Sequence, residues 1–197
     1  MWERWWTNLC VAALVATFVA LPACSNPTDE GPAVYAGVAS GLVMAVLVEG
    51  DAFVAYTCGD ETVLDANTAW FRGTLTATDQ ISVTDHPTSR LEMQVRDADI
   101  SGRLETPGGT QTPVLARTDE SEAGIFLAED GDCRTALVAI TTPAGIRTQG
   151  AHFCAETGPF FQVTPIRPVA TLGDGVDVSF TDDTGPREVR LQRVAAR

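Results

Sequence analysis

The hydrophobic positions past residue 33 come in short runs, and none of these runs keeps the 3.6-residue period of an amphipathic helix. The runs recur roughly every 8–14 residues and are divided by Gly, Pro, Asp and Thr, a spacing typical of an all-β protein. The predicted strands cover residues 34–38 with 42–48 (one long or broken strand), 52–58, 70–77, 81–84, 90–96, 100–105, 113–117, 124–129, the two arms of a hairpin over 133–154, and then 160–164, 176–180 and 188–194.

Two of these segments differ in how many faces of the predicted strand should be buried. Residues 42–48 read LVMAVLV, and a strand that is apolar at every position should be covered on both faces. Residues 90–96 read RLEMQVR, where apolar and polar positions alternate. Leu91, Met93 and Val95 should therefore face a core while their neighbours face water.

The order of the strands predicts the fold class. Eight strands follow one another by residue 129, joined by short turns without a helical crossover, which describes an antiparallel meander. Such a meander tends to close into a barrel because closure removes its edges. The alternative is a two-layer β-sandwich. The β region spans residues 34–197 as one domain, which a division near residue 130 would split into two.

The first residues have the layout of a secretory signal peptide over residues 1–23. Arg4 supplies a thin positive region, and residues 9–20 are apolar. The 15 residues from Leu9 to Ala23 fall short of the roughly 18–20 that a transmembrane helix needs. The segment Leu21-Pro22-Ala23-Cys24 resembles the lipobox of bacterial lipoproteins. That resemblance implies a diacylglycerol on Cys24, whereas an ordinary secretory signal with an incidental cysteine is the alternative.

Residues 24–33 should connect this anchor to the β domain. The sequence SNPTDEGPA after Cys24 contains two prolines and no apolar periodicity, so it is expected to act as a tether. A diacylglyceryl cysteine carries two acyl chains, which is enough for stable membrane attachment. The expected location is the cell membrane, with the protein lipid-anchored and facing outward, and the expected partner is the membrane itself.

The net charge of the chain limits the classes of partner that it is expected to bind. The net charge is −13 with a sequence pI of about 4.4, and all 13 basic residues are arginine. Such an acidic chain is not expected to bind nucleic acid or to adhere to anionic lipid by charge. Membrane attachment would then depend on the lipid alone.

The cysteines beyond the lipid site predict a disulfide, because an exported chain meets oxidising conditions. Residues 142–145 form a four-residue turn with proline at its second position. When Thr142 faces Gly145, the same register places Cys133 opposite Cys154, within reach of a disulfide. A bond from Cys58 to either of them is the rival pairing.

Five stretches of the chain carry a further resemblance: VYAGVASG, MAVLVEGDAFVAYTCGDE, AWFRGTL, SGRLETPGG and AGIFLAEDG. Together they resemble a loose group of uncharacterised exported β-rich proteins from GC-rich Gram-positive bacteria. The resemblance implies an exported β domain and brings no catalytic residue with it.

Catalytic and metal-binding patterns are weak. His86 lies in a predicted turn, His152 shares a strand face with Cys154, and the chain contains no G-x-S-x-G sequence. Zinc could use Cys58, Cys133, Cys154 and His152, but no C-x₂-C spacing supports it. The acidic loops at 130–132 and 174–177 contain Asp-Gly, which predicts turns rather than calcium sites. We therefore expect no catalytic residue, metal or cofactor.

Trp70 and Arg72 are the candidate ligand contacts. Alternation places Phe71 and Leu75 on one face of their strand and Trp70 and Arg72 on the other. That second face is mostly polar, so in a barrel it could line a wet interior with a stacking ring and a cation. A tryptophan packed under a loop or at a barrel mouth is the alternative.

These observations favour a membrane-anchored surface lipoprotein with a non-catalytic binding or interaction role in the cell envelope. The alternatives are an envelope hydrolase and a small-ligand carrier with an open barrel lumen around Trp70. A deep pocket that holds a histidine beside an acid and a hydroxyl would favour the hydrolase, and a filled core would favour the binding role.

Overall fold

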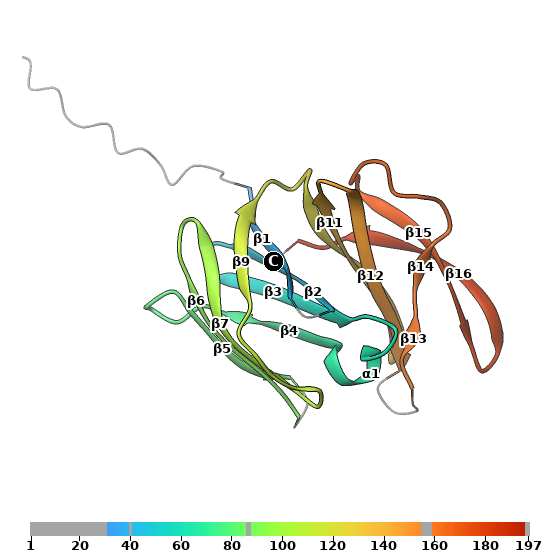
Figure 1. Ribbon diagram of the computed structural model, residues 1–197, viewed down its shortest axis with the longest axis horizontal. Helices are drawn as coiled ribbons and strands as arrows, with labels where there is room; N and C mark the ends of the chain where they lie inside the picture. The colour runs from blue at the N-terminus through green and yellow to red at the C-terminus, as the bar shows by residue number, and fades with distance from the viewer. Residues whose placement is uncertain (1–30, 40, 86–87, 155–158, 196–197) are drawn as a thin grey trace, which may run out of the picture.

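The computed structural model describes residues 31–39, 41–85, 88–154 and 159–195. This part of the chain is almost entirely antiparallel β-structure in two sheets, each nearly closed into a barrel (Figure 1). The larger barrel precedes residue 119 and the smaller one follows residue 122. The predicted fold class, an all-β protein whose antiparallel strands close into a barrel, is therefore confirmed.

The larger barrel contains eight long strands and one short strand. Their order around the sheet is β4-β3-β2-β1-β9-β7-β6-β5, and β4 lies next to β5, which nearly closes the ring. The short strand β8 pairs with β7. The bounds are β1 (Ala33–Ala39), β2 (Leu42–Glu49), β3 (Ala52–Gly59), β4 (Ala69–Thr74), β5 (Gln80–Asp85), β6 (Ser89–Val95), β7 (Asp99–Thr106), β8 (Gly109–Gln111) and β9 (Val114–Thr118), with the one-turn helix α1 (Leu64–Asn67) between β3 and β4.

The smaller barrel is built around two long hairpins. Its strand order is β13-β12-β11-β10-β16-β15-β14, and β13 approaches β15 on the far side. The bounds are β10 (Ala123–Asp130), β11 (Cys133–Thr142), β12 (Gly145–Cys154), β13 (Phe161–Gln162), β14 (Thr164–Pro165), β15 (Gly175–Asp182) and β16 (Gly185–Arg193).

The interior of the larger barrel is filled by apolar side chains. All eight long strands contribute, because every second residue of a strand points to the same face. Among the largest are Phe53, Phe71, Leu91 and Ile100, each no more than 2% exposed. Over the described residues, the centre of this barrel is therefore packed rather than open.

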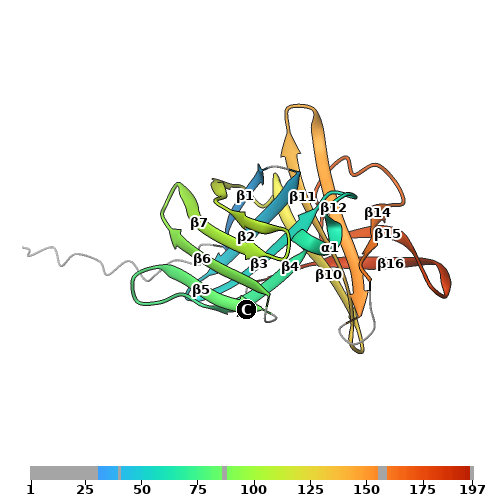
Figure 2. The same cartoon turned by 60° about the horizontal axis from the view of Figure 1, so that its bottom comes forward.

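A second apolar layer lies between the two barrels. The residues of β2 that point away from the larger barrel's interior, Val43, Ala45 and Leu47, pack with Ile125 and Val138 of the smaller barrel. Figure 2 shows β10–β12 crossing beside β2 and β3. The strand LVMAVLV is thus covered on both faces, as its composition predicts.

Two details of the expected fold are corrected. Residues 34–38 and 42–48 belong to two antiparallel strands, β1 and β2, because the chain reverses between Ala39 and Leu42 with Gly41 at a φ of +81°. The strand at 124–129 belongs to the smaller barrel as part of β10. Residues 119–122 link β9 of the larger barrel to β10 of the smaller one.

The structure also fixes where the N-terminal segment joins the domain. Gly31 lies beside the side chain of Glu120, which belongs to the link between the barrels. The expected signal peptide, Cys24 and the tether up to residue 30 lie outside the described residues. Within the described part of the chain, no helix has the length and apolar character required to span a bilayer.

Gly102 in β7 provides a test of the larger barrel. A methyl group there would collide with the backbone carbonyl of Glu92 and lie 2.6 Å from the Cα of Met93, and backbone atoms in a sheet cannot move aside cheaply. We expect Gly102→Ala to lower the free energy of unfolding by about 2–3 kcal/mol. Gly173→Ala, which would meet no atom within 4 Å, should change it by less than about 0.5 kcal/mol. Urea denaturation measures both, and equal effects would contradict the tight approach of β6 to β7.

Candidate functional site

The predicted disulfide joins β11 to β12. Thr142 faces Gly145 across the hairpin turn, and the same register places Cys133 directly opposite Cys154. The two residues are bonded, with their Cα atoms 3.9 Å apart. The pairing predicted from the turn is confirmed, and the rival pairing through Cys58 is not formed.

A pocket of about 240 Å³ lies beside this disulfide, in the smaller barrel. Strands β10, β11 and β12 supply one wall, and β15, β16 and the turn between them supply the other. The polar and sulfur-bearing side chains that line it include Cys133, Thr135, His152, Cys154, Asp182 and Arg187.

His152 is the central side chain of this pocket and is only 9% exposed. Its Nδ1 forms a hydrogen bond with the hydroxyl of Thr135 at 2.8 Å, and its Nε2 lies 3.7 Å from Sγ of Cys154. The ring stacks on Phe180, with centroids 4.1 Å apart and planes inclined by 15°. These contacts on two edges and one face fix the orientation of the imidazole.

The electrostatics of the pocket favour a neutral histidine. Burial lowers the pKa of His152, and the positive charge of Arg187 lowers it further, while the carboxylate of Asp182 acts in the opposite direction. Asp182 itself is held ionised, because hydrogen bonds from the hydroxyl and the backbone N–H of Thr184 lower the pKa of its carboxyl. The pocket therefore combines an uncharged imidazole with a fixed carboxylate.

This arrangement does not form a catalytic relay of the serine-hydrolase kind. In such a relay, the imidazole accepts the proton of a nucleophile at one nitrogen and donates a hydrogen bond to a carboxylate from the other. Here one nitrogen is bonded to Thr135, itself 4% exposed, and the other faces the disulfide sulfur. Asp182 receives its hydrogen bonds from Thr184 instead. His86, the other candidate histidine, lies outside the described residues.

Trp70 and Arg72 have the alternation that the sequence predicts, but their face does not line a barrel interior. Trp70 is 4% exposed and lies in the apolar layer between the barrels, 5.5 Å from the ring of Tyr56. Of the two readings of this face, the structure has the packed tryptophan rather than the wet lumen, because the smaller barrel covers this part of the outer face of β4. Arg72 remains exposed, and its guanidinium lies 5.3 Å from the Trp70 ring.

A second guanidinium contacts the same tryptophan. Arg134 of β11 also lies 5.3 Å from the Trp70 ring, and its Nε pairs with Glu129 at 3.1 Å. Cation–π contacts of this kind stabilise by about 0.5–2 kcal/mol. Trp70 thus joins the two barrels through its packing, and its indole N–H has no hydrogen-bond partner among the described residues.

Cys58 lies apart from the disulfide, in the apolar layer between the barrels. It is fully buried as a free thiol, and its Sγ lies 3.6 Å from the hydroxyl of Thr68. The four residues considered for zinc are therefore divided by the fold. Cys133, Cys154 and His152 come together, with their ligand atoms all within 4.8 Å of one another, whereas Cys58 belongs to the other layer.

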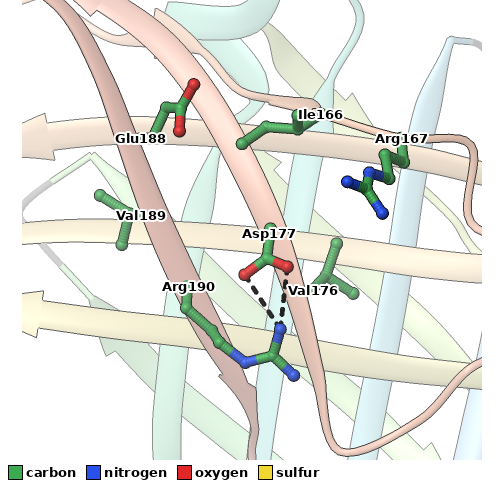
Figure 3. Close-up of a pocket in the computed structure, with 7 residues that line it drawn as sticks. All are labelled: Ile166, Arg167, Val176, Asp177, Glu188, Val189 and Arg190. Carbon is green, nitrogen blue, oxygen red and sulfur yellow. Dashed lines mark hydrogen bonds and ion pairs between the residues drawn. The ribbon is translucent and has the colours of Figure 1, made fainter.

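An open cleft of about 430 Å³ lies along β15 and β16 and the two residues that follow β14 (Figure 3). Ile166, Val176 and Val189 supply its apolar part, and four charged side chains lie around them. Arg190 contacts both carboxylate oxygens of Asp177 at 2.9 Å, but each side chain is more than half exposed, so the pair contributes at most about 1 kcal/mol. Arg167 and Glu188 are the other charged side chains. Sequence analysis missed this cleft, because its residues come from three separate segments.

Comparisons with known proteins leave the function open. No protein-family model matches the chain, and no curated protein sequence matches it. Among solved structures, it matches a chain from Eubacterium rectale that is provisionally assigned as a DNA polymerase III beta subunit. The two chains share 8% identity with a TM-score of 0.15, over 85% of this chain and 59% of the other. This chain therefore spans less than two thirds of that protein's length, and the match carries no argument about function.

The buried thiol of Cys58 generates a testable pH dependence. Burial raises the pKa of Cys58 from 9.0 to about 11. Below pH 9 the thiol is protonated in both the folded and the unfolded chain. Between pH 9 and about 11 only the unfolded chain loses the proton, so this thiol should lower the free energy of unfolding by roughly 1.4 kcal/mol per pH unit.

Urea denaturation of the wild type and of Cys58→Ala at pH 8, 9 and 10 measures this effect. The variant lacks the thiol and should lose less stability than the wild type as the pH rises. Tyr56 is present in both proteins, and burial, which raises its pKa most, is common to the two; Cys58 also raises the pKa of Tyr56, so the comparison measures the thiol together with its effect on this neighbour. Equal losses would contradict a buried, protonated thiol at Cys58.

Proposed function

We propose that this protein is a lipoprotein of the bacterial cell envelope, attached to the outer face of the cell membrane through a diacylglyceryl group on Cys24, with a non-catalytic binding or interaction role. The sequence LPAC after an apolar run of signal-peptide length supports the attachment. The first strand begins at Ala33, which leaves a short tether behind Cys24. With a net charge of −13, the domain is held at the membrane by lipid rather than by charge.

The disulfide supports export of the folded domain. Disulfides form and persist mainly in compartments outside the cytosol. The bond between Cys133 and Cys154 closes the central hairpin of the smaller barrel, and Cys58 stays reduced because the apolar layer buries it. This division between a paired and a protected cysteine suits an oxidising environment.

The packed interior of the larger barrel is the observation that most favours a binding role. Its centre is filled by apolar side chains, so the barrel serves as a rigid support rather than as a container. The contacts of His152 with Thr135 and the disulfide occupy the group that a hydrolase would need as a base. We therefore place the binding role on the outer surface, where the cleft along β15 and β16 offers both signs of charge around an apolar floor.

Metabolic labelling tests the anchor. Cells that express the wild-type chain should incorporate radiolabelled palmitate into it and retain it in the membrane fraction. Cys24→Ala should remove the label, since the thiol is the site of attachment. Cys58→Ala is the matched control and should keep the label, because that thiol is buried. Equal labelling of the wild type and Cys24→Ala would refute the lipoprotein assignment.

Site-specific photo-crosslinking in cells tests the binding surface. A photoreactive residue in place of Arg167, at the cleft, should yield a discrete adduct with an envelope component. The same residue in place of Thr110, an exposed position of the larger barrel, should not yield that adduct. No adduct at Arg167, or the same adducts at both positions, would remove the cleft as the binding surface.

A further inference from the structure

Three side chains with metal-ligating atoms meet at one end of the smaller barrel. His152 and Cys154 are two residues apart on β12 and so share a face, while Cys133 lies opposite Cys154 on β11. Their Nε2, Nδ1 or Sγ atoms all lie within 4.8 Å of one another. In the disulfide form the two sulfurs are bonded to each other, so neither is a thiolate.

The spacing of these atoms fits a tetrahedral metal ion. Zinc binds thiolate at about 2.3 Å and imidazole at about 2.0–2.1 Å, which places the nitrogen and sulfur ligands of one ion roughly 3.6 Å apart. Nε2 of His152 lies 3.7 Å from Sγ of Cys154. Two thiolates on the same ion lie roughly 3.8 Å apart, a separation that becomes available once the bond between them is broken.

The residues around His152 orient its imidazole ring so that Nε2 can bind a metal ion. Metal-binding histidines almost always use one ring nitrogen for the metal and hold the other through a hydrogen bond that fixes the tautomer. When Nδ1–H donates to the hydroxyl of Thr135, at 2.8 Å, the lone pair of Nε2 faces Cys154. Phe180, stacked on the ring at 4.1 Å, keeps the imidazole in that plane.

We propose that Cys133, Cys154 and His152 form a binding site for a thiophilic divalent cation such as Zn²⁺ when their disulfide is reduced, so that the same hairpin is closed either by a covalent bond or by a metal ion. The reductant is a dithiol, which becomes a disulfide as it transfers two electrons and two protons to the two cysteines. The cation then displaces both thiol protons. Two thiolates neutralise its charge, and the fourth coordination position faces the pocket of about 240 Å³.

Cobalt titration tests the site directly. The protein is the full-length chain with Cys10→Ser and Cys24→Ser, purified in detergent, so that Cys58, Cys133 and Cys154 are its only cysteines. After reduction by a phosphine, one Co²⁺ should bind per chain, with thiolate-to-cobalt charge-transfer absorption and the strong visible bands of a tetrahedral centre. The oxidised protein should show neither. Failure of the reduced protein to bind Co²⁺, or equal binding by the oxidised protein, would overturn the proposal.

Variants identify the ligands. Cys58→Ser is the matched control and should leave the Co²⁺ spectrum and affinity unchanged, because Cys58 belongs to the other layer. His152→Ala should remove the tetrahedral bands or weaken binding at least tenfold. Thr135→Val keeps the shape of the side chain but loses the hydrogen bond to Nδ1, and it should weaken binding about 10–100-fold. Circular dichroism confirms that each variant is folded, and unchanged affinity in folded His152→Ala would refute the assignment.

Discussion

The apolar layer between the two barrels is the contact on which the rest of the structure depends. Strands β1–β3 form part of the wall of the larger barrel and also one side of this layer, so their side chains are buried on both faces. Each large aliphatic side chain buried in this way contributes about 1.5–3 kcal/mol. Because the same strands serve both cores, neither barrel can leave the other without exposing a continuous apolar surface. Trp70, with Arg72 and Arg134 against its ring, extends this contact to β4.

The pocket around His152 in the smaller barrel forms because β15 and β16 close over β11 and β12. Strands β11 and β12 alone would hold His152, Cys133 and Cys154 on an open hairpin. The return of β15 and β16 places Phe180 on the imidazole and Asp182 and Arg187 across from the disulfide, and so turns a hairpin face into a pocket. The disulfide therefore borders a pocket with polar side chains, whereas the thiol of Cys58 is buried in the apolar layer between the barrels.

The sequence predicted the strands and one long-range bond well, because both follow from local rules. Alternation located most strands, the uniform run at 42–48 indicated a strand with two covered faces, and the turn at Thr142–Gly145 set a register that brought Cys133 to Cys154. The surroundings of the Trp70 face stayed open between a packed ring and a wet lumen, since alternation separates two faces of a strand without saying which one a second barrel covers. The two pockets could not be predicted from the sequence for a related reason. The His152 pocket and the cleft of Figure 3 each need β15 and β16, whose partners no local pattern identifies.

The position of Gly31 beside Glu120 has a mechanical consequence. The seven peptide units from Cys24 to Gly31 span at most about 25 Å, so any attachment at residue 24 would keep this point of the domain within that reach of its support. The point lies at the junction of the barrels rather than at the tip of either one. A pull on the N-terminal segment would therefore act near the middle of the molecule, with short lever arms to both halves. Such loading tends to reorient the domain as a whole instead of peeling one barrel from the other.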